Sequence, residues 1–351
     1  MNLEYRLMRP EEAPAVQTLI RSCFSYFYYA MVEKPKEAVI ALDGDRIVGG
    51  SVFKTIKLKD KGIGYLEWGF TDSEYRGKGI GRTCYKQALD LMSNAGCSDL
   101  TSMVLDDNSA SWRQFSHEGF KRITLMQAIS RYGLGGTFKL WFSTFSVFAM
   151  GSSLWFSSEK DPIVERRDTT LTSYLMILLC NLLIILGKGL LLGRSFQANA
   201  MTFLAFVCFL SIMVSLKFLI ISPKMRPVLR MWRTGQFIPI IVMLLGGVFP
   251  FYGDVYPDKG NDWDVREYRK IFGISSAVCW VITALFSVAS TILPESRFFY
   301  ALSNYAVMFL FLNILTIIFE SFDGARVLRW NKTIYYVLTV ISIIIVIWLM
   351  F

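Results

Sequence analysis

The pattern of hydrophobic and polar positions changes near residue 132. Before it, short stretches alternate apolar and polar side chains, as residues 3–8 do, and such alternation predicts strands. Residues 13–23 carry apolar side chains at helical spacing, and Asp43-Gly44-Asp45 is a hairpin turn signal. Residues 100–105 and 121–130 are expected to be later strands. The pattern predicts an α/β domain, a mixed sheet with flanking helices, over residues 1–132.

After residue 132 the chain is mostly apolar to its last residue. A membrane span needs about 20 apolar residues. Five segments meet that length, and we expect each to cross a membrane: 171–193, 200–222, 271–293, 299–319 and 333–351. Residues 237–251 are shorter and interrupted by glycines and Pro250, which favours a re-entrant segment. The prediction is an all-α, multi-span membrane domain over 171–351, joined to the first domain by a flexible joint and an interfacial segment at 133–170, whose apolar stretch is 138–157.

Composition and charge support this division. The chain is 53% hydrophobic, its mean hydropathy is +0.41, and its net charge is +9. Residues 1–137 contain 18 Lys and Arg and 16 Asp and Glu, and residues 138–351 contain 19 Lys and Arg and 12 Asp and Glu. Residues 223–236 hold four basic and no acidic side chains, so this loop is predicted to be cytoplasmic. Five spans and a cytosolic N-terminal domain follow from this count, with seven spans as the competing solution.

Other classes of protein fit less well. No basic run interleaved with aromatics indicates nucleic-acid binding. The six cysteines form no CxxC pair and are interpreted as buried small hydrophobic side chains in a reducing compartment.

Residues 65–82, YLEWGFTDSEYRGKGIGR, carry the candidate chemistry. A strand over 65–71 and a turn over 72–75 lead into a glycine-rich loop, residues 76–81, which opens a helix to about residue 93. Glycines let the backbone approach an anion, and the first N–H groups of a helix point at it. This order predicts a phosphate-binding site at the start of the helix.

The stretch resembles the acetyl-CoA motif of the GNAT superfamily of N-acetyltransferases, with Arg76, Gly79 and Gly81 at the defining positions. Residues 108–115 with Gly119-Phe120 resemble the family's later helix, and the likeness covers about 3–132. The resemblance implies acetyl-CoA as the acetyl donor and Glu67 as a base for the acceptor amine. It implies that Phe70 and Thr71 backbone groups hold the pantetheine and polarise the thioester. The other implied cofactor contacts are Arg76, Gly77, Lys78, Gly79, Ile80, Gly81, Arg82 and Asn108.

Two features complicate that chemistry. Where the family commonly has a tyrosine that protonates the leaving thiolate, this chain has Phe115, which carries no such proton. The single histidine, His117, is expected on the helix surface. Residues 24–29, FSYFYY, stand where the family places part of its acceptor wall, but packing against the core or a membrane explains them equally well.

Residues 240–335 resemble the site-2 protease family of intramembrane zinc metalloproteases, through Asn313 and the later Asp323-Gly324. The zinc-binding His-Glu-x-x-His is missing, since 138–351 contain no histidine, so we expect no metal and no active protease. Asp323 is interpreted as structural, with Arg326 as its partner. Lys188 and Lys217 fall within expected spans, and Lys188 is the more interesting of them because it lies where the protease motif would fall.

These observations favour a membrane-integrated GNAT-type N-acetyltransferase that acts at the cytosolic face of the cell membrane. Its acceptor would be an amine of a protein or small molecule. The alternative is an acetyl-CoA-responsive sensor or scaffold built on an inactive protease-like domain. Transport of an acetylated product is a third, less supported interpretation.

Overall fold

The computed structural model describes residues 3–24, 31–58, 61–158, 161–165, 169–193, 195–247, 249–258, 265–316 and 319–350. Residues 25–29 of the aromatic cluster lie outside these ranges. The chain forms two compact units. The first comprises residues 1–147 and 152–166, and the second comprises 148–151 and 167–351.

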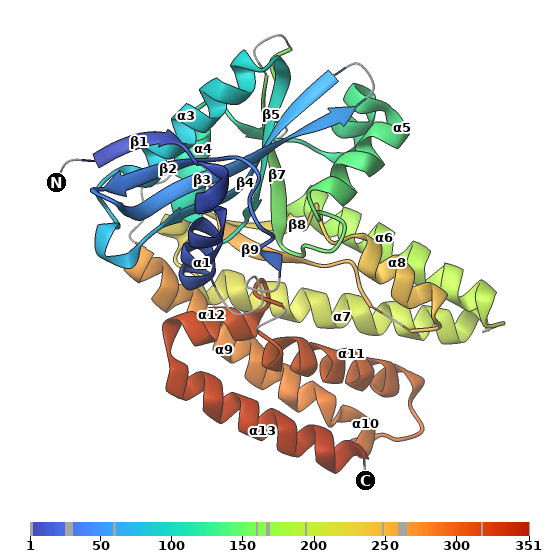
Figure 1. Ribbon diagram of the computed structural model, residues 1–351. Helices are drawn as coiled ribbons and strands as arrows, with labels where there is room; N and C mark the ends of the chain where they lie inside the picture. The colour runs from blue at the N-terminus through green and yellow to red at the C-terminus, as the bar shows by residue number, and fades with distance from the viewer. Residues whose placement is uncertain are drawn as a thin grey trace. The chain divides into compact units, whose positions relative to one another are not determined.

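The first unit is built on a seven-stranded sheet in the order β1-β2-β3-β4-β5-β7-β6 (Figure 1). Strands β1 to β4 are antiparallel neighbours, β4 and β5 run parallel, and β7 is antiparallel to both β5 and β6. The strands are β1 (Leu3–Leu7), β2 (Ala38–Asp43), β3 (Arg46–Leu58), β4 (Lys61–Thr71), β5 (Cys97–Leu105), β6 (Lys121–Arg122) and β7 (Ser152–Ser158).

Helices cover both faces of this sheet. On one face, α3 (Ile80–Asn94) and α4 (Ser109–His117) pack over a core that includes Leu66 and Trp155. On the other face, α1 (Ala13–Cys23), preceded by the 3-10 turn η1 (Pro10–Glu12), buries Val16 and Ile20 against Phe70. Helix α5 (Leu125–Ser143) lies on the face of α1, because its Tyr132 ring stacks at 6.0 Å on Phe156, which points away from Trp155. The expected mixed sheet with flanking helices is therefore confirmed.

The end of this unit differs from the prediction. Residues 121–130 are not a closing strand, since β6 stops at Arg122 and α5 begins at Leu125, where Thr124 forms a capping box with Gln127. Gly133, the expected joint, is a kink within α5 at φ 69°. Strand β7 lies inside the segment expected at a membrane interface. The unit thus extends past residue 132, because Trp155 and Phe156, both fully buried, complete the core on the two faces of the sheet.

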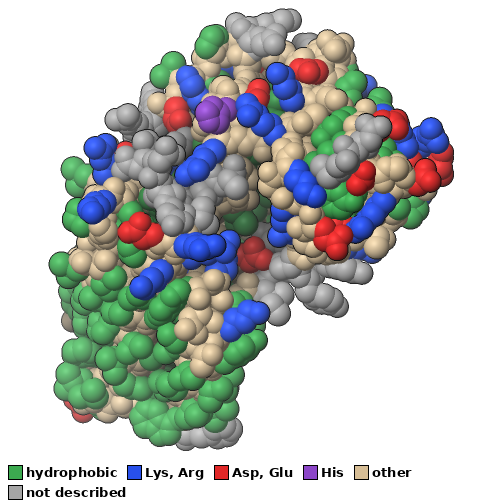
Figure 2. All heavy atoms as spheres, turned by 90° about the vertical axis from the view of Figure 1, so that its left-hand side faces the viewer, with side chains coloured by type: hydrophobic (Ala, Val, Ile, Leu, Met, Phe, Trp, Pro, Cys, Tyr) green, Lys and Arg blue, Asp and Glu red, His purple; other side chains and the backbone are tan. Residues whose placement is uncertain are grey.

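The second unit is helical. Its main helices are α6 (Thr170–Leu191), α7 (Phe196–Ile220), α8 (Phe237–Leu244), α9 (Val265–Ser287), α10 (Ala289–Ile292), α11 (Arg297–Ile314), α12 (Asp323–Trp330) and α13 (Lys332–Met350). Among the described residues, five helical stretches are long and apolar enough to cross a membrane: 170–191, 196–220, 266–292, 297–314 and 332–349. They coincide with the five predicted spans. Figure 2 shows hydrophobic side chains gathered over these helices and charged ones over the first unit.

The basic loop 223–236 is more ordered than its charge suggested. After a short turn, η3 (Pro223–Met225), it forms β8 (Pro227–Met231), which pairs antiparallel with β9 (Gly253–Pro257). Arg230 is only 3% exposed and donates from Nη2 to the Pro257 carbonyl oxygen at 2.9 Å. The loop is thus partly a buried two-stranded sheet.

Lys217 of α7 lies within a buried group of charges. Its Nζ is 2.5 Å from an Oδ1 of both Asp254 and Asp323, and Arg326 Nη1 is 2.8 Å from Asp254 Oδ2. Ser276 Oγ also donates to Asp323 at 2.7 Å. The expected partner of Asp323 was Arg326, whereas the closest cation here is Lys217, and Arg326 holds the second carboxylate. Two cations and two anions balance, which satisfies the requirement for burying charge.

Asn313 and Gly324 have a packing relationship that accounts for their place in the sequence. The Asn313 Oδ1 accepts a hydrogen bond from the Gly324 N–H at 3.2 Å, and any Cβ on Gly324 would collide with the Asn313 backbone. The Asn…Asp-Gly pattern therefore fixes the start of α12 against the end of α11. Protease chemistry is not needed to explain it.

Candidate active site

The candidate site lies where two central strands separate. Strands β4 and β5 pair from Gly62 with Cys97 to Leu66 with Ser102. Beyond these pairs β4 continues to Thr71 and β5 to Leu105, and no further pairing between them occurs among the described residues. Parallel strands that stop pairing leave one backbone edge of each without its sheet partner. A ligand that carries amide groups can bond to such an edge.

Glu67 stands at a bulge beside this separation. Phe53 of β3 pairs with Leu66 and Val52 pairs with Trp68, so Glu67 is an extra residue on β4. Bulges turn a side chain out of the regular alternation and occur often beside active sites. Lys54 Nζ donates to Glu67 Oε1 at 2.8 Å, and the two side chains are 41% and 31% exposed. The carboxylate is therefore accessible, and the Lys54 ammonium orients it.

The glycine loop has the shape that the sequence predicts. Gly77 and Gly79 both have φ of +79°, and Gly79 is the N-cap of α3. Glycine lacks the side chain that other residues use to cap a helix, so the first N–H groups of α3 are left for another acceptor. A Cβ built on either glycine meets no atom within 4 Å. The loop therefore faces open space, and a phosphate could approach its backbone.

Side chains around the loop hold it in place. Asp72 accepts from the Glu74 N–H at 3.1 Å and from Arg46 Nη2 at 2.8 Å. The Tyr75 hydroxyl donates to Asp43 Oδ2 at 2.9 Å. Lys78 Nζ lies 4.5 Å from the centre of the Tyr75 ring. The loop is therefore tied to the β2–β3 hairpin at two points.

The loop's predicted cofactor contacts differ in exposure. Arg76, Lys78 and Arg82 are exposed, as phosphate-binding cations must be, whereas Ile80 is 1% exposed and packs in the core. Ile80 can therefore offer a ligand only its backbone N–H. Gly81 lies at the first turn of α3, where a Cβ would come within 3.4 Å of Thr71 Oγ1.

The register of β4 separates the two predicted backbone contacts. The Asp72 N–H donates to the Val48 carbonyl at 2.9 Å, and Phe70 pairs with Gly50 two residues earlier. Alternate residues of a strand direct their backbone groups to the same edge. The backbone N–H and C=O of Phe70 therefore point toward β3, and its ring lies in the core. The backbone groups of Gly69 and Thr71 point toward the edge where β5 no longer pairs with β4. The backbone groups available to a ligand at this edge are therefore those of Gly69, which sequence reasoning missed, and of Thr71.

Two positions that the sequence singled out belong to α4: Asn108 at its start and Phe115 within it. Asn108 is the N-cap of α4, and its Oδ1 accepts from the Ser111 N–H at 3.2 Å. This structural role accounts for the residue without a ligand. Phe115 is 7% exposed and contacts Tyr85 edge-on at 4.9 Å. His117 lies exposed at the end of the helix, as expected. Phe115 itself therefore has no proton to offer a thiolate.

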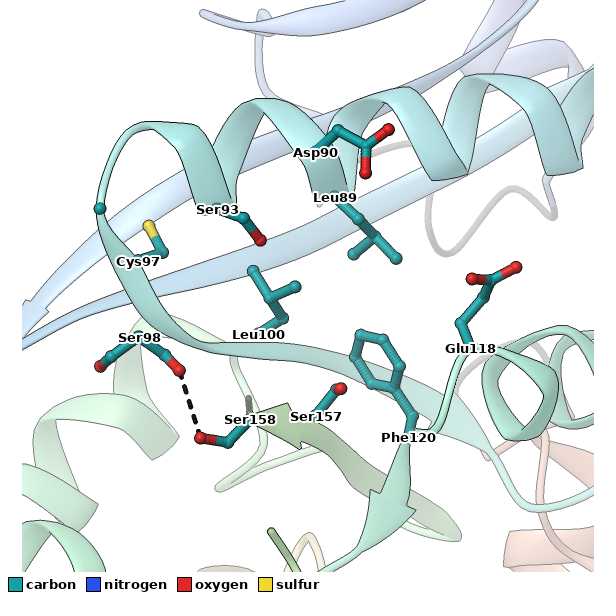
Figure 3. Close-up of a pocket in the computed structure, with 11 residues that line it drawn as sticks. Leu89, Asp90, Ser93, Cys97, Ser98, Leu100, Glu118, Phe120, Ser157 and Ser158 are labelled. Atoms are coloured by element: carbon teal, nitrogen blue, oxygen red, sulfur yellow. Dashed lines mark hydrogen bonds between the residues drawn. The ribbon is translucent and has the colours of Figure 1, made fainter. Parts of the chain in front are cut away.

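A cavity elsewhere in the first unit is distinct from this site. It has a volume of about 270 Å³ and lies between the C-terminal half of α3, the start of β5 and the end of β7 (Figure 3). Ser93 and Ser157 point toward it, and Leu100 and Phe120 form its apolar wall. The glycine loop is at the opposite end of α3, so this cavity takes no part in the site. In the described residues, no group of three or more His, Cys, Asp or Glu side chains could hold a metal.

Residues 5–120 match the sequence model of the acetyltransferase (GNAT) family. These residues form a GNAT acetyltransferase domain. The site-2 protease likeness of the second unit receives no such support. No curated protein matches the chain.

Several solved structures show a likeness to part of the chain. A chain of the NatC complex bound to Gag peptide and CoA is 20% identical, with 45% of this chain and 99% of that chain covered and a TM-score of 0.33. The PaiA N-acetyltransferase of Thermoplasma acidophilum in complex with coenzyme A is 16% identical, with 45% and 99% covered and a TM-score of 0.33. The IAA acetyltransferase of Bacillus cereus is 16% identical, with 35% and 79% covered and a TM-score of 0.29.

Proposed function

We propose that this protein is a membrane-integrated N-acetyltransferase that moves an acetyl group from acetyl-CoA to an amine at the cytosolic membrane face. One observation carries the donor assignment. Two glycines at φ +79° open the N-terminus of α3 beside the point where β4 leaves β5, within a GNAT domain. A helix N-terminus attracts a pyrophosphate, and an unpaired strand edge attracts the amides of a pantetheine arm. Both features occur together here.

Different residues would bind the cofactor and stabilise the transition state. Arg76, Lys78 and Arg82, with the N–H groups of the loop, would hold the pyrophosphate. The N–H groups of Gly69 and Thr71 would donate hydrogen bonds to a pantetheine carbonyl and to the thioester oxygen. As the amine nitrogen attacks the carbonyl carbon, negative charge develops on that oxygen, and hydrogen-bond donors at this position stabilise the transition state.

Glu67 would remove the proton from the attacking amine. A positioned general base accelerates such a step by about 10² to 10⁴. The C–N bond forms, the C–S bond breaks, and coenzyme A departs as a thiolate that takes its proton from water. Water serves here because the side chain at position 115 is a phenyl ring packed in the core.

The membrane assignment rests on the second unit. Five helices of suitable length and hydropathy, with basic loops on one side, support integration with the acetyltransferase unit in the cytosol. The acceptor would then be an amine presented near the bilayer. Re-entry of residues 237–251 remains part of this proposal, with α8 as its helical portion.

The buried Phe115 favours a second candidate, a sensor that binds acetyl-CoA without turnover. Release of free coenzyme A by the detergent-purified, full-length protein decides between the two. Membrane extract serves as the acceptor pool, and mass spectrometry identifies any acetylated product. Acetyl-dependent release that is lost in Glu67→Gln supports the transferase. Binding of acetyl-CoA without release in any extract supports the sensor and contradicts the transferase.

A further inference from the structure

Helix α5 presents a stripe of large apolar side chains to solvent. Leu134, Phe138 and Phe142 follow one another at i, i+4 and i+8 and are 62%, 44% and 57% exposed. Residues at this spacing share one face of a helix. Leu140 lies on the opposite face and is 0% exposed, and Trp141, next to the stripe, is 8% exposed. The helix therefore buries some of its apolar side chains and leaves this stripe of large ones exposed, which an ordinary surface helix does not do.

The stripe continues along the chain toward the second unit. Phe145 and Phe148 are 44% and 40% exposed. Phe148 is the first residue of the segment 148–151, which belongs to the second unit. Three residue steps separate Phe145 from Phe148, and a chain of that length spans at most about 11 Å. The covalent chain alone thus keeps the end of the stripe close to residue 148.

The segment 148–151 is held by two basic stretches of the second unit. The Thr234 hydroxyl donates to the Ala149 carbonyl, and the Ser321 hydroxyl donates to the Met150 carbonyl at 2.8 Å. Thr234 belongs to the basic loop 223–236, and Ser321 lies two residues before α12, which carries Arg326 and Arg329. Positive loops mark the cytosolic side of a membrane protein. The stripe therefore ends at the side of the second unit where lipid headgroups would lie.

We propose that the α5 stripe, residues 134, 138, 142 and 145, is a lipid-contact surface. It inserts into the headgroup region of the bilayer that holds the second unit, and so keeps the acetyltransferase unit against the membrane. Aromatic side chains favour this region, and Lys139, exposed beside the stripe, favours anionic lipid. This inference rests on the proposed membrane location. It deepens the proposed function, because a docked unit would meet amines at the bilayer surface.

Spin-label depth measurements on the full-length protein test this proposal. The protein is reconstituted in nanodiscs of phosphatidylcholine and phosphatidylglycerol. The partly exposed native cysteines Cys23, Cys180 and Cys208 are replaced by alanine. A single nitroxide is attached in the Phe142→Cys variant, and collision with oxygen is compared with collision with a water-soluble nickel chelate. A label in lipid collides more with oxygen, which gives a positive depth parameter.

Two further labels make the result decisive. Ile344→Cys in α13, where the side chain is 60% exposed, reports whether the second unit is in lipid at all. Asp90→Cys, on the exposed side of α3, reports a surface of the first unit that faces water. We expect positive values at 142 and 344 and a negative value at 90. Phe138→Cys, one turn away, should agree with 142.

The failures can be told apart. A positive value at 344 with negative values at 142 and 138 overturns the lipid-contact surface and leaves the proposed function intact. Negative values at 344 and 142 together overturn the membrane location, and the inference falls with it. Strong dipolar broadening at 142 with low oxygen collision would show that a second copy of the chain covers the stripe, which also contradicts the proposal.

Discussion

Gly77 and Gly79 give the loop before α3 its shape, since both adopt a backbone conformation that side chains disfavour. A β-branched residue at φ +79° is a genuine outlier. We expect Gly79→Val to weaken acetyl-CoA binding at least 10-fold, because relieving the strain turns the N–H groups away from the pyrophosphate. Calorimetric titration measures this. Gly96→Val is the matched control, since Gly96 has φ +85° and equally open surroundings but lies at the opposite end of α3. Equal affinities for the two variants would contradict the phosphate assignment.

Glu67 and Lys54 form an ion pair, and proton removal is proposed to depend on its carboxylate. We expect Glu67→Gln to lower kcat by about 10² or more, in line with the loss of a general base, with little change in the Kd for acetyl-CoA. Steady-state kinetics with a responsive amine provide the measurement. Glu74→Gln, an exposed carboxylate that pairs with Arg46 at 3.2 Å, serves as control. If both variants retain full kcat, Glu67 is an ordinary strand residue.

At this scale the sequence predicted some positions and not others. The glycine loop could be predicted because its conformation requires glycine at defined spacing. The sequence could not predict that Gly69, rather than Phe70, directs its backbone groups to the open edge. The bulge at Glu67 shifts by one residue which backbone groups of β4 point to that edge. Asn108 shows the converse, since a residue type that suits a cofactor also suits a helix cap.

Among the elements, α5 is fastened to the sheet through a buried ion pair. Arg131 donates from Nε and Nη2 to Asp99 at 3.0 and 2.6 Å, and the Tyr132 hydroxyl donates to Asp99 at 2.9 Å. Burial of Asp99 opposes its ionisation, but the hydrogen bonds from Arg131 and Tyr132 outweigh burial and lower the pKa of Asp99 below its ordinary 3.8. A folded pKa below the unfolded one stabilises the fold above about pH 4, and this stability is lost as the pH falls through the folded value.

Without Arg131, the effect of burial on the pKa of Asp99 should exceed that of the remaining hydrogen bonds. In Arg131→Gln, burial without the guanidinium raises the pKa of Asp99, so we expect acid unfolding to begin at a higher pH than in the native chain. At pH 7 the free energy of unfolding should fall by about 3 kcal/mol, the cost of breaking a buried pair. Circular dichroism measures the first during acid titration and the second during urea unfolding at pH 7. Arg46→Gln, whose guanidinium side chain is 56% exposed, should leave the acid transition unchanged.

In the second unit, Lys217 joins elements distant in sequence through Asp254 and Asp323. We expect Lys217→Met to cost about 3–5 kcal/mol, because two buried carboxylates lose their shared cation. Thermal unfolding in detergent provides the comparison. Lys217→Met combined with Asp323→Asn removes one charge of each sign and should recover part of the loss. A double variant no more stable than the single one would mean that the cluster is not coupled through charge.

Elements of the apolar half were predictable because length and hydropathy alone define a long helix. Strand β7 was not, since SSLWFSS is as compatible with a membrane surface as with a sheet. Its seven register pairs with β5 depend on a partner some 50 residues earlier in the chain. Lys217 was placed within an expected span, but the identity of its carboxylate partners depends on how α7, β9 and α12 pack.

Over the whole molecule, the chain leaves the first unit after residue 147, contributes 148–151 to the second, and returns to build β7. The compact first unit therefore extends past residue 132. A chain ending at Tyr132 lacks β7, which removes Trp155 and Phe156 from the two faces of the sheet and leaves the outer edge of β5 unpaired. We expect this chain to melt without cooperativity and to aggregate.

A chain ending at Arg166 retains β7 and the Arg131 contact to Asp161, so we expect it to unfold cooperatively in circular dichroism. The two chains should also differ in acetyl-CoA binding. Strand β7 is the antiparallel partner of β5, and β5 forms one side of the strand separation at the candidate site. The longer chain should therefore bind acetyl-CoA in calorimetry and the shorter one should not. If the chain ending at Tyr132 folds and binds acetyl-CoA, β7 is dispensable, and the acetyltransferase unit ends where the hydrophobic pattern first suggested.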